Sequence, residues 1–219
     1  MIPRRADALP PADTLKPAHC MTANVHVLVL AAGASTRLGQ PKQLVRINGR
    51  PALHIALSNA VAVAGNAVTV VIGANANDLT YLLAHSPASS IVNRQWEEGI
   101  ASSLRCGLAV VPASADAVMI VLGDQVCVTS DDLKRLVAAW NTQETNIAAA
   151  TYDRHVGVPA IFPRWCFTDL AGLRGDEGAR KILLRNPDRV TRVPMSNAGF
   201  DLDTPEDLAA LTKKMNNEA

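Results

Sequence analysis

The sequence predicts a three-layer α/β/α sandwich, in which helices cover both faces of a mostly parallel β-sheet. Two observations support this fold class. From residue 25 onward, segments with strand character alternate with segments of helical character. Three of the strand segments are nearly continuous apolar runs, which is typical of strands that are covered on both faces in a parallel sheet. Such an alternation places a helical layer on each side of the sheet.

The elements are expected in a regular order along the chain. The expected strands are residues 25–30, 67–73, 89–93, 117–122 and 146–152, and the expected helices are roughly residues 51–64, 77–85, 100–111 and 131–140. Thr129 or Ser130 is placed to cap the last of these helices. Ligands bind beyond the carboxyl ends of the strands in sheets of this kind, so residues that directly follow a strand are the first candidates for a binding site.

Residues 25–219 are expected to form a single domain, because no internal repeat or linker divides them. Residues 1–24 contain four prolines and no long apolar run, and we expect them to form a disordered tail that is neither a signal peptide nor a membrane span. The four cysteines are widely spaced without a Cys-x-x-Cys pair, which predicts free thiols in a reducing compartment, the cytoplasm.

The charge of the chain is balanced. The net charge is +1 and no basic run is longer than two residues. This argues against a nucleic-acid-binding surface and against a polybasic membrane anchor. Any anion-binding site must therefore be local.

The segment LAAGASTRLGQPKQL, residues 30–44, follows the first strand and combines glycines with cations. Backbone N–H groups in such a loop can form an anion-binding concavity, and Arg37 and Lys42 could neutralise phosphate oxygens. A tight turn with two solvated cations is the alternative. The pattern Gly-x-Gly-x-x-Gly is absent, and Gly39 is not followed by the lysine of a Walker loop. These differences disfavour a dinucleotide oxidoreductase and a P-loop ATPase.

Acidic residues stand at two further positions. Asp124 follows the strand expected over residues 117–122, and Asp201 and Asp203 precede a helix start at Thr204. The two latter aspartates would lie on the same side of an extended segment. An acidic group beside a phosphate loop needs a cation between them, and Mg²⁺ binds one or two carboxylates together with phosphate oxygens and water. An acidic helix start without further function is the alternative for the second position.

Two segments carry polar residues where a helix begins. Ser102 and Ser103 open the helix after a strand and could contact a base, a ribose or a phosphate. Gly175, Gly178 and Arg180 lie where another helix begins and suit a second anion, such as the phosphate of an acceptor. A capped surface helix is an equal alternative for this second segment.

Six short motifs follow one another along the chain: LAAGASTRLGQPKQL, EGIASSLRCGL, LGDQ, GVPAIFPR, GDEGAR and DLDTPEDL. In this order they resemble the family of nucleotidyltransferases similar to molybdenum cofactor cytidylyltransferase, which includes accessory proteins of purine catabolism and of xanthine dehydrogenase. The resemblance covers about residues 25–211. The first motif is shared by many sugar-nucleotide and cytidylyl transferases, so the later motifs specify the branch.

The resemblance implies a Rossmann-like fold of the nucleotide-diphospho-sugar transferase type. It also implies an enzyme that binds CTP with Mg²⁺, joins CMP to molybdopterin and releases pyrophosphate, with a molybdenum hydroxylase as a candidate client. The implied catalytic residues are Arg37, Lys42 and Asp124; the implied metal ligands are Asp124 and Asp203, with Asp201 as the alternative to Asp203; the implied binding residues are Ala31, Ala32, Gly33, Arg37, Lys42, Asn93, Ser102, Ser103, Gly175 and Arg180.

The choice of base and acceptor depends on single residues. Ala32 points to CTP, since the guanylyl branch typically has a second glycine there. Val126 stands where the family commonly has proline, and Val158 stands where many cofactor enzymes have histidine, so the acceptor side is the least secure. Guanylyl transfer and another phosphorylated acceptor, such as methylerythritol phosphate, remain alternatives. A further alternative is a non-catalytic protein that carries the cofactor to a xanthine-dehydrogenase-type hydroxylase. Such a carrier would not need the cationic loop together with Asp124.

Overall fold

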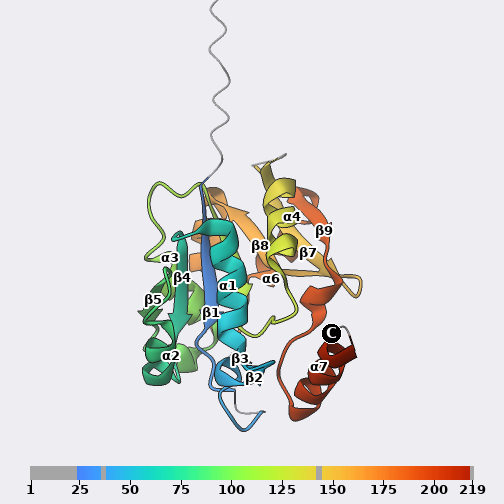
Figure 1. Ribbon diagram of the computed structural model, residues 1–219. Coiled ribbons are helices and arrows are strands. Elements are labelled where there is room, and N and C mark those ends of the chain that lie inside the picture. The colour runs from blue at the N-terminus through green and yellow to red at the C-terminus, as the bar shows by residue number, and fades with distance from the viewer. Residues whose placement is uncertain (1–23, 36–37, 142–144, 218–219) are drawn as a thin grey trace, which may run out of the picture.

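The computed structural model describes residues 24–35, 38–141 and 145–217, and its centre is a seven-stranded sheet (Figure 1). The strands are β1 (Val25–Ala31), β4 (Val68–Ile72), β5 (Ser89–Val92), β6 (Ala117–Leu122), β7 (Ile147–Tyr152), β8 (His155–Pro163) and β9 (Val190–Pro194), in the order β5-β4-β1-β6-β8-β7-β9. Only β8 runs antiparallel to its neighbours, β6 and β7, among these strands. The mostly parallel sheet confirms the predicted fold class.

Helices cover both faces of this sheet. They are α1 (Ala52–Ala64), α2 (Ala76–Leu83), α3 (Ile100–Leu108), α4 (Ser130–Asn141), α5 (Phe167–Ala171), α6 (Arg180–Arg185) and α7 (Pro205–Asn217). Successive side chains of β1 point to opposite faces. Val27 and Val29 therefore pack in one core with α1, α2 and α4, whereas Leu28 and Leu30 pack in a second core with α3, α5 and α6. The three layers are arranged as predicted.

A third apolar cluster joins the loop after β1 to the C-terminal segment. Leu38 and Val45 of that loop pack with Leu202, which is fully buried, and with Leu211 of α7. In Figure 1, α7 lies beside the small hairpin of β2 (Arg46–Ile47) and β3 (Arg50–Pro51). This packing holds the segment that carries Asp203 against the first loop.

The five predicted strands and four predicted helices are present, with ends within three residues of the expected ones. Thr129 caps α4, because its hydroxyl accepts a hydrogen bond from the N–H of Asp132 at 3.2 Å. Thr204 caps α7 in the same way, with the N–H of Asp207 at 3.2 Å.

Two strands of the central sheet, β8 and β9, are absent from the sequence prediction, as is the small hairpin of β2 and β3. The motif GVPAIFPR lies within β8 and continues just past its end, although proline and glycine are disfavoured inside central strands. The hairpin turn between β7 and β8 is also hard to recognise, since Asp153 and Arg154 adopt positive φ angles of 46° and 64° without glycine. Because β8 is antiparallel to β6, its first residues lie at the edge where β1 and β6 end.

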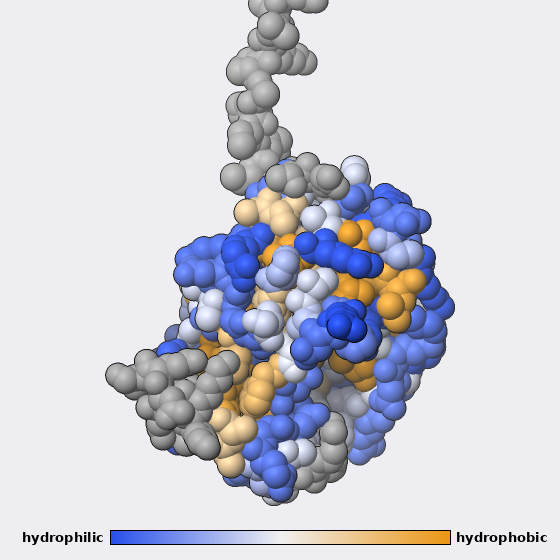
Figure 2. All heavy atoms as spheres, turned by 90° about the vertical axis from the view of Figure 1, so that its right-hand side faces the viewer, coloured by the Kyte–Doolittle hydropathy of each residue, from blue (hydrophilic) through white to orange (hydrophobic). Residues whose placement is uncertain are grey.

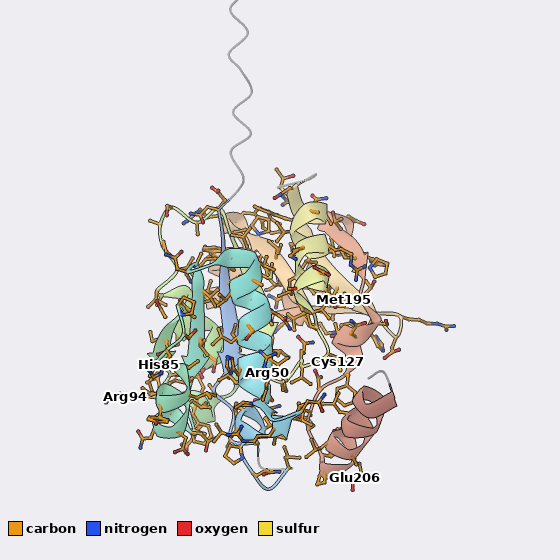
Figure 3. All side chains as sticks on the ribbon, viewed as in Figure 1. Arg50, His85, Arg94, Cys127, Met195 and Glu206 are labelled. Carbon is orange, nitrogen blue, oxygen red and sulfur yellow. The ribbon has the colours of Figure 1, made fainter. Side chains whose placement is uncertain are left out.

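Three further features of the described part of the chain are the hydropathy of its helices, the character of its surface and the state of its cysteines. None of the described helices is long and apolar enough to cross a membrane. The face that carries α4, β9 and α7 is largely hydrophilic, with separate apolar areas (Figure 2). The described cysteines, Cys106, Cys127 and Cys166, form no disulfide, and Cys127 lies in the loop after β6 (Figure 3). The tail expected over residues 1–24 lies outside the described residues, apart from Asn24.

Candidate active site

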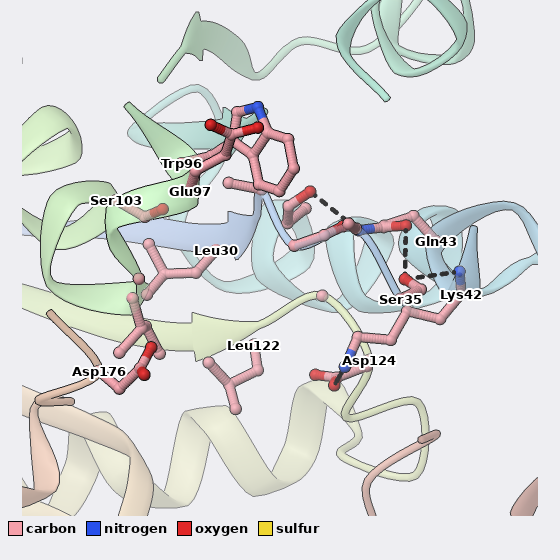
Figure 4. Close-up of a pocket in the computed structure, with 17 residues that line it drawn as sticks. Leu30, Ser35, Lys42, Gln43, Trp96, Glu97, Ser103, Leu122, Asp124 and Asp176 are labelled. Atoms are coloured by element: carbon pink, nitrogen blue, oxygen red, sulfur yellow. Dashed lines mark hydrogen bonds and ion pairs between the residues drawn. The ribbon is translucent and has the colours of Figure 1, made fainter. Parts of the chain in front are cut away.

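A pocket of about 440 Å³ opens at the carboxyl ends of β1 and β6 (Figure 4). Residues 31–35 of the loop after β1 line one wall, together with Lys42. Asp124 lines the pocket after β6, and Trp96 and Ser103 line it from the side of α3. The pocket therefore lies where ligands bind in parallel α/β sheets, and it brings together the first two candidate motifs.

Lys42 is held between two of the predicted acidic residues. It belongs to the short helix η1 (Lys42–Leu44), and its Nζ forms ion pairs with Asp124 and, at 2.9 Å, with Oδ1 of Asp203. Burial alone would lower the pKa of Lys42, but the charges and hydrogen bonds of Asp124 and Asp203 outweigh it and raise that pKa. Lys42 is therefore a fixed positive charge at neutral pH.

A third carboxylate, that of Asp201, adds negative charge to this edge. The pKa of Asp201 is raised to about 6, first by partial burial and then by the negative charges of Asp124 and Asp203. Asp124, Asp201 and Asp203 therefore bring carboxylate oxygens together at this edge, and such oxygens are the ligands that a hard divalent cation prefers.

Arg37, the other predicted phosphate ligand, lies outside the described residues. Ala31, Ala32 and Gly33, which were expected to cradle the triphosphate, all line the pocket. The side chain of Ala32 is buried, and a Cβ atom at Gly73 would come within 2.6 Å of the carbonyl oxygen of Ala32. Gly73 therefore allows the end of β4 to lie directly against the loop.

Gln43 also lines the pocket, although it was not among the candidates from the sequence. Its side chain is buried, and its Nε2 donates hydrogen bonds to the carbonyl oxygens of Ala31, at 3.1 Å, and of Gly33, at 2.8 Å. Ser35, which has a φ of 59°, accepts a hydrogen bond from the N–H of Lys42 at 3.0 Å. These contacts fix the path of the loop. In the sequence, the tripeptide PKQ at residues 41–43 was the signal that could have identified Gln43.

Asn93, Ser102 and Ser103 form one buried cluster, but only Ser103 lines the pocket. Asn93 donates hydrogen bonds to the hydroxyls of Ser102, at 2.8 Å, and of Ser103, at 3.1 Å. Ser102 donates in turn to the carbonyl oxygen of Gly99, at 2.8 Å. Asn93 and Ser102 thus stand behind Ser103 and brace the start of α3.

Gly175 and Arg180 are separated from the cationic end of the site. The carbonyl oxygen of Gly175 accepts a hydrogen bond from the N–H of Ala101 at 3.0 Å. Arg180 lies at a second, mainly apolar pocket of about 150 Å³, and its Nη2 is 3.2 Å from Nδ1 of His155. This second pocket shares Leu30, Ile100 and Leu122 with the first one, so the two pockets adjoin.

The site combines a glycine-containing loop after β1 with a lysine that pairs with an aspartate after β6, the neighbouring strand in the sheet. This combination places the protein among nucleotidyltransferase-like α/β proteins. Comparison with known families agrees, because residues 27–190 match the model of the MobA-like NTP transferase domain. The chain belongs to this family.

Several relatives match over most of their length. The purine catabolism protein PucB of Bacillus subtilis is 29% identical, over 85% of this chain and 95% of that protein. Nicotine blue oxidoreductase of Paenarthrobacter nicotinovorans is 30% identical, over 84% of this chain and 94% of that protein. The crystal structure of Rv0371c from Mycobacterium tuberculosis has a TM-score of 0.76 at 30% identity, over 88% of this chain and 99% of that one. Rv0371c has also been solved in complex with manganese, with a TM-score of 0.74 at 28% identity, over 87% of this chain and 99% of that one.

Proposed function

We propose that this protein is a magnesium-dependent nucleotidyltransferase that transfers CMP from CTP to molybdopterin and releases pyrophosphate. The observation that carries the proposal is the convergence of Asp124 and Asp203 on the ammonium group of Lys42, beside the loop that lines the pocket. This places positive charge and potential metal ligands together at one end of a pocket large enough for a nucleotide.

The donor set of the site fits a hard divalent cation. Asp124 and Asp203 would hold Mg²⁺, because their carboxylate oxygens already converge on a single cationic group. Among the described residues, no group of three or more His, Cys, Asp or Glu side chains could hold a metal ion. Substrate phosphates and water would then complete the coordination, as is usual for Mg²⁺. When bound, the ion would supply charge neutralisation for the phosphates. The manganese complex of the mycobacterial relative supports a divalent cation.

The residues of the site suit in-line phosphoryl chemistry. An oxygen atom of the acceptor phosphate forms a bond to the α-phosphorus of CTP, the bond from that phosphorus to the bridging oxygen breaks, and pyrophosphate leaves. The acceptor phosphate is already anionic, so no general base is required. Lys42 stays charged and stabilises the negative charge on the phosphate oxygens, while the loop fixed by Gln43 positions them.

The proposed base and acceptor follow from single residues and from the adjoining pocket. Ala32, where the guanylyl branch has glycine, favours CTP. The adjoining apolar pocket that Val158 and Arg180 line is the available space for the acceptor. A release assay for pyrophosphate tests both choices: CTP, GTP, ATP and UTP are compared, each with and without molybdopterin. We expect release with CTP and molybdopterin together, and a preference for GTP would overturn the assignment of the base.

The same assay separates this proposal from its rivals. Release of pyrophosphate with methylerythritol phosphate in place of molybdopterin would identify another acceptor. Binding of molybdenum cofactor without release from any triphosphate would identify a carrier for a hydroxylase. One relative is named an oxidoreductase, so oxidation of NADH and NADPH is followed in parallel. We expect none, because the loop after β1 lacks the dinucleotide pattern.

A further inference from the structure

The pocket has a second charged end, which is formed by Asp176. This residue lies in the loop between α5 and α6 and lines the same pocket as Lys42 (Figure 4). In Figure 4, Asp176 and Ser103 are at one end, whereas Lys42 and Asp124 are at the other. The sequence reasoning considered Gly175, next to Asp176, but not the aspartate itself.

The loop that carries Asp176 is in close contact with the residues before α3. Gly99 has a φ of 110°, and a Cβ atom at this position would lie 2.5 Å from Oδ1 of Asp176 and 2.5 Å from the carbonyl oxygen of Gly175. The N–H of Ala101 donates to that same carbonyl at 3.0 Å. Only glycine fits the conformation and the space at position 99.

Arg105 ties the two segments together a second time. Its Nη2 contacts both carboxylate oxygens of Glu98, at 2.7 and 2.6 Å, and its Nη1 donates to the carbonyl oxygen of Leu173 at 2.8 Å. A single side chain of α3 therefore bridges the segment before α3 and the loop after α5. These contacts hold the backbone on both sides of Asp176, so the loop that carries this aspartate is fixed beside the pocket.

A carboxylate accepts hydrogen bonds and repels phosphate groups. The end of the pocket at Asp176 therefore disfavours the triphosphate and favours groups that carry O–H or N–H donors. Given the proposed function, on which this inference rests, we propose that Asp176 is a specificity-determining residue that accepts a hydrogen bond from the nucleoside of the bound triphosphate. The donor is either the 2′-hydroxyl of the ribose or the exocyclic amine of cytosine.

The test measures binding of nucleotides, not turnover. Affinities of CTP, 2′-deoxy-CTP and UTP in the presence of Mg²⁺ are measured by calorimetry for the wild type, for Asp176→Ala and for Asp176→Asn. Asp188→Asn is the control, because it removes the same charge at a distant position. Asp188 lies in η4 (Pro187–Arg189), just before β9, at the end of the sheet where the parallel strands begin and away from the pocket. Thermal unfolding of each variant checks the fold.

We expect Asp176→Ala to weaken binding of CTP by about 10- to 100-fold, the range for a hydrogen bond to a charged group, and Asp188→Asn to leave it unchanged. If the variant loses affinity for CTP but not for 2′-deoxy-CTP, the donor is the ribose hydroxyl; if it loses affinity for CTP but not for UTP, the donor is the amine. A merely structural role would weaken all three nucleotides equally and would overturn the proposal.

Two other results would also decide the matter. Wild-type affinity for CTP in Asp176→Ala would overturn the inference. A raised KM for the acceptor in the pyrophosphate-release assay of that variant would then assign the residue to the acceptor. Failure of the wild type to bind any of the three nucleotides would instead overturn the proposed function itself, and the inference with it.

Discussion

Nζ of Lys42 and Oδ1 of Asp203 are 2.9 Å apart, although the two residues come from the first loop and from the last segment before α7. The burial of Leu202 beside Leu38 and Val45 holds these distant segments together. The core cluster therefore builds the charged end of the site, and a change there acts on chemistry as well as on stability.

Replacement of Lys42 by alanine should remove most of the turnover. In the proposed reaction the ammonium group is a positive charge beside the phosphates, so its loss should cost on the order of 3 kcal/mol of transition-state stabilisation, or about 100-fold in kcat. Asp124→Asn should have an effect of similar size. Lys134→Ala is the matched control, because Lys134 pairs with Asp131 on the exposed side of α4. Near-normal pyrophosphate release in both site variants, with folding intact, would refute the assignment.

The two C-terminal aspartates should differ in metal binding. Asp203 contacts Lys42 directly, whereas Asp201 interacts with Lys42, Asp124 and Asp203 through its charge. Asp203→Asn should therefore weaken binding of Mn²⁺ in the presence of CTP by at least about 10-fold, and Asp201→Asn should weaken it less. Paramagnetic resonance of Mn²⁺ measures both dissociation constants. The reverse order would make Asp201 the metal ligand.

Gln43→Ala should destabilise the fold and slow the reaction together. The variant loses two hydrogen bonds to buried or partly buried carbonyl groups, which corresponds to about 2 kcal/mol in the free energy of unfolding. Turnover should also fall, since the carbonyls belong to the loop that lines the pocket. Gln40→Ala changes an exposed glutamine of the same loop and serves as control. Urea unfolding that does not distinguish the two variants would contradict this role.

Gly99→Ala should be more harmful than an equivalent change at Gly65. Both glycines have positive φ angles, of 110° and 58°, so both substitutions strain the backbone by about 1–3 kcal/mol. Only Gly99 also faces Asp176 and Gly175, whereas no atom lies within 4 Å of the Cβ position at Gly65. Thermal unfolding and CTP affinity measure the difference. Equal losses in the two variants would mean that the contact with Asp176 has no effect.

The sequence predicted those features that depend on local patterns. β1 and β6 are nearly continuous apolar runs, and Thr129 and Thr204 cap helices through residues three positions away. β8 was missed because Pro159 lies inside it, and proline usually argues against a central strand. Local patterns thus identified five strands of the central sheet, β1, β4, β5, β6 and β7, but not β8, the antiparallel strand that pairs with β7, or β9.

Contacts between distant segments were the part of the site that the sequence could not predict. Asp124 could be named as a candidate from its position after a strand, and Asp203 from its position before a helix start. Their convergence on Lys42 depends on the packing of Leu202, which no local pattern specifies. The family resemblance implied that Asn93 is a binding residue, and in the fold it lies behind Ser103, where its amide donates to two buried hydroxyls.

The stability of the fold should depend on pH through His26. This residue is buried on β1, with its Nε2 2.9 Å from Oγ1 of Thr69, and burial lowers its pKa below the ordinary value of 6.5. As the pH falls below 6.5, the unfolded chain binds a proton at this histidine that the folded chain does not bind. The free energy of unfolding should therefore decrease between pH 6.5 and the lower pKa of the folded state, by up to about 1.4 kcal/mol per pH unit.

His26→Gln should remove this contribution, because glutamine does not titrate. Urea unfolding at pH 7.5 and pH 5.5 measures the change in stability for the wild type, for His26→Gln and for His85→Gln, in which an exposed histidine is replaced. We expect the loss of stability on acidification to be smaller in His26→Gln than in the wild type, and unchanged in His85→Gln. If His26→Gln loses as much stability as the wild type, the acid sensitivity of the fold comes from another group.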